Sequence, residues 1–142
     1  MIVELQPVAT TRYDAVLKKV GKRLAEQQVI ASPDLFLAGV AAWPGKNKTL
    51  AKQGIRVLCF DPPTSDDPRV VTAPLINEQS FQRADQLPLW LVIVLIGPNT
   101  HNQPEFIQLL RILADPQACR ELHQLPVSLL SGAIRRLLIL EN

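Results

Sequence analysis

Apolar residues near the start of the chain repeat at steps of three and four, which is the spacing of one helix face. Thr11 precedes the repeat as an N-terminal cap, and the acidic Asp14 stands three residues later, as in a capping box. The pattern predicts a helix that ends near Gln28, with a buried face formed by Tyr13, Val16, Leu17, Val20 and Leu24.

Several short apolar runs, each bounded by proline, glycine or aspartate, predict strands. They are Ile2–Leu5, which we expect at a sheet edge, then Leu35–Trp43, Gly54–Phe60, Arg69–Leu75 and Leu89–Ile96. The last run is apolar on both sides, so it predicts a central strand covered by other elements on both faces. We interpret the polar segment Lys46–Gln53 as a loop or a single turn, and Gln79–Gln86 as a short helix.

Proline and aspartate divide the last third of the chain into three helices. Pro104 suits the first turn of one helix, Asp115 caps the next, and Pro126 separates it from a third, capped by Ser128. The residues that we expect to be buried are Phe106, Ile107, Leu109, Leu110 and Leu113, then Ala118, Cys119 and Leu122, then Leu129, Leu130, Ala133, Ile134, Leu137 and Leu138.

These elements predict an α/β (α+β) fold, with a mixed sheet of about four to five strands covered by helices on both sides. A length of 142 residues predicts a single domain, residues 1–142. No apolar run reaches the roughly 18 residues that a membrane-spanning helix needs, and the start of the chain does not resemble a signal peptide. Cys59 and Cys119 lie far apart and outside any metal-binding spacing, which favours small core residues in a reducing, cytoplasmic compartment.

Two loops follow predicted strands and are candidates for a binding site, because ligands of open α/β sheets favour the carboxyl ends of strands. One follows Trp43 and contains Lys46, Asn47 and Lys48; the other follows Ile96 and contains Asn99, Thr100, His101 and Asn102. Together they predict a pocket for a small anion or an acidic side chain. The alternative is two exposed loops made of turn-forming residues.

Catalytic motifs are missing from the sequence. It contains no nucleophile elbow, phosphate-binding glycine loop, dinucleotide-binding glycine triplet or HExxH pair, and we predict no cofactor and no metal site. His101 lacks an evident partner to orient it as a base, and we expect His123 at the surface or boundary of a helix. Residues alone therefore favour a binding protein over an enzyme.

Four cations, Lys18, Lys19, Lys22 and Arg23, lie on the polar side of the first predicted helix. They form either a solvated basic face or a docking surface for an acidic partner. A nucleic-acid-binding role for them, together with the Lys46–Lys52 loop, is not favoured, because the formal net charge is only +2 and no exposed aromatic series accompanies it. The apolar stretch "IRRLLILEN" either finishes a core helix or docks on a second subunit, so homo-oligomerisation stays open.

The order "GVAAWPG", "GIRVLCF", "LWLVIVLIGP" and "PEFIQLLRILADPQACREL" resembles two related groups of domains. One is the enzyme IIA domains of the mannitol/fructose class of the bacterial sugar phosphotransferase system. The other is the cytoplasmic domain of the anion-exchanger (band 3, bicarbonate transporter) family, which shares that fold and which "VLIGP" resembles most. The resemblance runs from about Tyr13 to Leu137 and implies an enzyme IIA-like fold.

The same resemblance bears on chemistry. Enzyme IIA proteins accept phosphate on a histidine in a motif like Pro-His-Gly, whereas the matching piece here, residues 42–46, places Pro44 next to Gly45 with no histidine. A second active-site histidine of that family lies at the start of the helix after the apolar strand; His101 falls near that place, but the best alignment of the helix puts Phe106 there. The resemblance thus implies a non-catalytic regulatory or protein-interaction domain, linked to membrane transport of ions or inorganic carbon, with a transporter or membrane complex as the partner. The alternative is a phosphocarrier or small-molecule enzyme that uses His101.

Overall fold

The structure is a computed structural model, and it describes residues 2–5, 13–42, 48–50, 54–60, 68–79, 89–97 and 103–140. Within these residues five strands form one mixed sheet in the order β1-β4-β5-β3-β2. The strands are β1 (Ile2–Leu5), β2 (Lys48–Leu50), β3 (Ile55–Phe60), β4 (Arg69–Gln79) and β5 (Leu89–Ile96). β3 runs parallel to β5 and β1 parallel to β4, whereas β4 is antiparallel to β5 and β2 antiparallel to β3.

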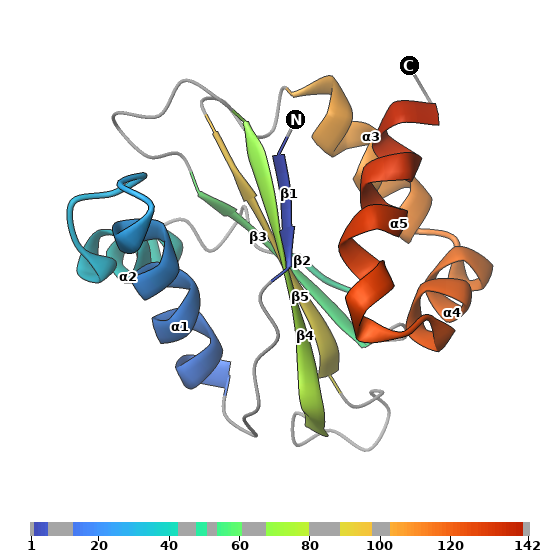
Figure 1. The fold of residues 1–142 in the computed structure, drawn as a ribbon, viewed down its shortest axis with the longest axis horizontal. Coiled ribbons are helices and arrows are strands. Elements are labelled where there is room, and N and C mark those ends of the chain that lie inside the picture. The colour runs from blue at the N-terminus through green and yellow to red at the C-terminus, as the bar shows by residue number, and fades with distance from the viewer. Residues whose placement is uncertain are drawn as a thin grey trace.

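Helices cover both faces of this sheet, so the molecule has three layers (Figure 1). α1 (Tyr13–Glu26) and α2 (Pro33–Ala42) lie on one face. α3 (Pro104–Leu113), α4 (Pro116–Gln124) and α5 (Val127–Leu140) lie on the other. The prediction of a mixed sheet between two helical layers is therefore confirmed. Among the described residues, no helix is both long and apolar enough to cross a membrane.

β5 is the central strand, as its unbroken apolar sequence predicts. It lies third in the sheet order, and every side chain from Leu91 to Ile96 is fully buried. Its side chains alternate between two cores, because successive residues of a strand point to opposite faces. Leu91, Ile93 and Leu95 join the core under α3–α5, and Val92, Val94 and Ile96 join the core under α1 and α2.

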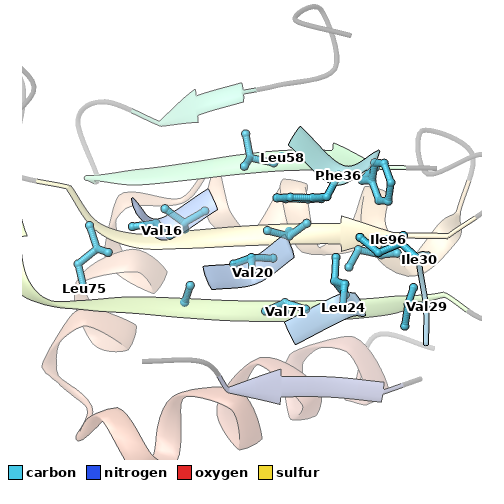
Figure 2. Close-up of a cluster of buried hydrophobic side chains, with 14 residues drawn as sticks. Val16, Val20, Leu24, Val29, Ile30, Phe36, Leu58, Val71, Leu75 and Ile96 are labelled. Carbon is cyan, nitrogen blue, oxygen red and sulfur yellow. The ribbon is translucent and has the colours of Figure 1, made fainter. Parts of the chain in front are cut away.

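The core under α1 and α2 is aliphatic apart from one pair of aromatic rings (Figure 2). Val16, Val20 and Leu24 of α1 are fully buried in it, which confirms the predicted apolar face of this helix. Phe36 of α2 and Phe60 of β3 pack edge to face, with ring centroids 5.3 Å apart. These apolar contacts hold α1 and α2 on the sheet.

The prediction of a strand at Leu35–Trp43 is wrong, because residues 33–42 form α2. The segment is apolar on nearly every side, so its periodicity could not separate a strand from a helix. The informative signal was Pro33 followed by Asp34, a proline and an acidic residue in a first helical turn.

Three smaller expectations also need correction. The Lys46–Gln53 segment contains the edge strand β2, and β4 continues through Pro74 to Gln79, where a helix was expected to begin. A register irregularity between Pro74 and Gln79 accommodates the proline within β4. Ile107 and Leu129, expected to be buried, are 44% and 51% exposed. Thr11 and residues 80–86 lie outside the described residues.

Proline and aspartate begin the C-terminal helices largely as predicted. Pro104 opens α3, and the Asp115 carboxylate accepts a hydrogen bond from the Gln117 backbone N–H at 3.1 Å, which caps α4. α5 begins at Val127, so Ser128 lies inside the helix and does not cap it.

The C-terminal end of α1 contains a residue in an unfavourable backbone conformation. Gln28 has φ of 61°, its N–H donates to Ala25 O at 3.1 Å, and the Val29 N–H donates to Leu24 O at 2.9 Å. This is the bonding pattern of a Schellman motif, in which glycine is the preferred residue at the position of Gln28.

Gln28→Gly is expected to raise the free energy of unfolding by about 0.5–1 kcal/mol, because it removes the steric cost of a left-handed conformation from an exposed position. Urea denaturation measures the change. Gln28→Ala is the control and should bring no gain, since alanine keeps the Cβ. Equal stabilisation by both substitutions would contradict this account of the α1 end.

Candidate functional site

One candidate loop follows Ile96 in the sequence, and we call the end of the sheet at Ile96 the Ile96 end. β3 and β5 both finish there, since Phe60 pairs with Ile96, and β4 begins there, since Arg69 also pairs with Ile96. Five of the six predicted site residues, Lys46, Asn47, Asn99, Thr100 and His101, lie outside the described residues, as does Asn102. Lys48 opens β2, and its side chain is likewise outside the description.

The two candidate loops were paired because each was expected to follow a strand, and the fold does not support that reason for the first loop. The "WPGKNK" loop follows helix α2, not the end of a strand as expected. It nevertheless leads into β2, which is antiparallel to β3, with Lys48 opposite Val57 and Leu50 opposite Ile55. β2 therefore starts on the side of β3 that faces the Ile96 end.

Close backbone packing defines the described part of the Ile96 end. The Gly97 N–H donates to Phe60 O at 3.2 Å, which ties the ends of β3 and β5 together. A Cβ at Gly97 would lie 3.0 Å from Pro68 Cα, so the segment entering β4 crosses directly against the end of β5. Arg69 provides a cation here, and its Nη1 donates to Gln27 Oε1 at 3.3 Å.

The Arg69 guanidinium thus contacts Gln27, which follows the last residue of α1. The described residues supply no metal centre, since no three His, Cys, Asp or Glu among them come together as ligands. Cys59 on β3 is half-buried, and Cys119 is buried in α4, where its Sγ donates to Leu113 O at 3.1 Å. Burial, reinforced by the negative charge of Asp115, raises the pKa of the Cys119 thiol, so it is a structural donor rather than a nucleophile.

The opposite end of the sheet, the Trp90 end, carries a feature that sequence reasoning missed. The His123 ring of α4 stacks on the Trp90 ring of β5, with centroids 4.2 Å apart and planes within 8°. His123 is exposed, as predicted, whereas Trp90 is buried. The two residues are 33 positions apart, and no spacing or motif in a single sequence indicates such a pair.

Beside this ring pair, the connection from α4 to α5 has an apolar surface. Leu125 and Val127 are 36% and 41% exposed. They border a hollow of about 240 Å³ that is also lined by Trp90 and His123, and Leu125 borders a second hollow of about 250 Å³ along α4 and α5. Surface of this kind suits an apolar side chain better than a charged ligand.

Comparison with known proteins bears on the fold. No protein-family model matches the chain, and no curated protein sequence matches it. Among solved structures, the chain is similar to the crystal structure of nitrogen regulatory protein IIA-Ntr from Neisseria meningitidis. The TM-score is 0.67, and the match covers 96% of this chain and 92% of that one at 15% sequence identity.

At this identity the likeness shows the fold alone: the chain has an enzyme IIA-like fold. That result supports the resemblance implied by the sequence at the level of architecture. The mannitol/fructose class and the link to anion exchangers stay predictions.

Proposed function

We propose that the 142 residues form one enzyme IIA-like regulatory domain, which acts in the cytoplasm by binding a protein partner and does not transfer a phosphoryl group. The fold is similar to that of nitrogen regulatory protein IIA-Ntr. In the proposed role, the Lys46–Lys48 and Asn99–His101 loops hold an acidic side chain or small anion of the partner. The partner is a transporter or membrane complex for ions or inorganic carbon, as the anion-exchanger resemblance implies.

The position of His123 carries this proposal. Phosphotransfer in enzyme IIA domains, as the sequence resemblance implies, uses a phosphate-accepting histidine and a second histidine beside it. This chain has two histidines in all. His123 stacks on Trp90, the second residue of β5, whereas His101 follows the last residue of β5 in the chain. β5 spans about 20 Å between these ends, so His123 does not complete a pair at the Ile96 end.

Incubation with phosphoenolpyruvate, enzyme I and the histidine carrier protein tests the proposal. We expect the chain to stay unphosphorylated. Acid-labile phosphate on the protein would contradict a purely binding role.

The alternative function is a phosphocarrier or small-molecule enzyme that uses His101. The observation that favours it is the place of His101 in the chain, just after the carboxyl end of the central strand, where α/β folds concentrate their chemistry. His101→Gln should then abolish activity and leave thermal unfolding unchanged. Full activity in this variant would exclude the role.

A further inference from the structure

The outward face of α1 carries a compact group of cations, which we call the α1 basic face: Lys18, Lys19, Lys22 and Arg23. All four side chains are exposed. The opposite side of the helix is fully buried against the sheet through Val16, Val20 and Leu24. On a helix, residues three and four apart are neighbours, so the four cations form two adjacent rows within about 8 Å of helix axis.

The α1 basic face holds four of the 15 basic residues of the chain. The chain has 15 basic and 13 acidic residues, a formal net charge of +2. Without the four cations, 11 basic residues face 13 acidic ones, so the rest of the chain has a net charge of −2. The α1 basic face is therefore a positive patch on an otherwise slightly negative protein.

Within the patch, Lys19 is the least neutralised cation. Glu26 stands one turn after Lys22 and Arg23, and in the sequence Asp14 precedes Lys18 by four positions. Lys19, by contrast, has Ala15 and Val16 one turn before it and Lys22 and Arg23 one turn after it. Like charges at these spacings repel each other and weaken a helix.

The helix dipole explains only part of this arrangement. Cations are stabilised in the last turn of a helix, which accounts for Arg23. Lys18 and Lys19 lie in the middle of α1, where the dipole gives no such benefit. An acidic ligand along the helix would remove the repulsion at Lys19.

We propose that the α1 basic face binds an acidic segment of a partner protein, rich in Asp and Glu and lying along the helix. This inference rests on the proposed function in one respect, which is that the partner is a protein. Carboxylates spaced along a peptide match the two rows of cations, and the complementary charge speeds their association.

A nucleic acid or a membrane fits the same face less well. Duplex DNA carries a charge about every 1.7 Å and would extend past the patch of about 8 Å onto the rest of the chain, whose formal net charge without the four cations is −2. Membrane-surface helices insert an apolar side into the bilayer, and the apolar side of α1 is buried against the sheet. The exposed large apolar residues among those described lie on α2 and on the α3–α5 layer.

Lys19→Glu tests the proposal, with Arg111→Glu as the matched control. Arg111 is exposed on α3, on the far side of the sheet, and its replacement changes the net charge by the same amount. The probe is a fluorescein-labelled synthetic peptide of Asp, Glu and Ser, titrated by fluorescence anisotropy at low and at physiological salt. We expect Lys19→Glu to weaken binding about tenfold and Arg111→Glu to change it by less than about twofold, because exposed charge contacts act locally.

Thermal unfolding gives a second readout that separates binding from folding. The carboxylate introduced by Lys19→Glu lies one turn before Lys22 and Arg23, so the variant should unfold about 2–3 °C higher than the native chain. A variant that gains stability and loses binding has not lost binding by unfolding.

Three results would overturn the proposal: no saturable binding of the peptide by the native chain, equal weakening by Lys19→Glu and Arg111→Glu, or tighter binding of duplex DNA or phosphatidylserine vesicles than of the peptide. The proposed function fails separately, through phosphorylation of the chain. If the chain stays unphosphorylated and does not bind the acidic peptide, the proposed function stands and this inference fails.

Discussion

Gly39→Ala is expected to lower the free energy of unfolding by about 3 kcal/mol, through overpacking between α2 and β3. A Cβ at Gly39 would lie 2.8 Å from Cδ2 of Phe60 and closer still to Cε2. The Phe60 ring is only 6% exposed and packs edge to face on the fully buried Phe36. It therefore cannot move aside without disturbing a second ring.

Gly132→Ala provides the control for this prediction. Gly132 is exposed on α5, and a Cβ there meets nothing within 4 Å. Alanine is the better helix former, so this variant should gain about 0.5–1 kcal/mol. Urea denaturation of both variants measures the contrast, and adding Phe60→Leu to Gly39→Ala should recover part of the loss. Similar gains for both alanine variants would mean that α2 does not pack against Phe60 as described.

Gly97→Ala is expected to cost about 3 kcal/mol and to disturb the Ile96 end of the sheet. Gly97 has φ of 154°, a conformation that L-residues rarely adopt, and a Cβ would lie 3.0 Å from Pro68 Cα. The close contact is with backbone, so a side-chain rotation cannot relieve it. The strain would push the start of β4 away from the end of β5.

Hydrogen exchange identifies the mechanism in the Gly97→Ala variant. The amide of residue 97 bonds Phe60 O in the native chain and should lose protection, while amides in the middle of β5 keep theirs. Native-like stability together with unchanged protection at residue 97 would contradict the described packing of this end.

The sequence predicted elements where one signal dominates. The apolar run of β5 admits only a buried central strand at that length, and Asp115 followed by Pro116 begins a helix unambiguously. α2 was mistaken for a strand because "LFLAGV" is apolar on nearly every side, so neither the strand period nor the helix period stands out. Pro33 and Asp34 in the first turn were the signal for a helix. β2 was missed because it is only three residues long and lies between polar residues in the sequence. It forms a strand only by pairing with β3.

The sequence predicted the candidate site less well than it predicted the fold. The two loops were paired through a strand that does not exist, because residues 33–42 form a helix. The first loop leads into β2, which starts on the side of β3 that faces the Ile96 end. The predicted side chains themselves lie outside the described residues. The Trp90–His123 stack depends on how α4 packs over the sheet, which no local pattern reports.

The most direct test of the account is whether the chain accepts a phosphoryl group. The native protein and a mannitol-class enzyme IIA would be incubated in parallel with phosphoenolpyruvate, enzyme I and the histidine carrier protein, and their intact masses measured before and after acid treatment. We expect that the enzyme IIA gains an acid-labile phosphoryl group and that this chain does not, since His123 stacks on Trp90 near the start of β5 whereas His101 follows the end of β5 in the sequence. An acid-labile phosphoryl group on this chain, lost in His101→Gln, would contradict the account and establish the phosphocarrier alternative.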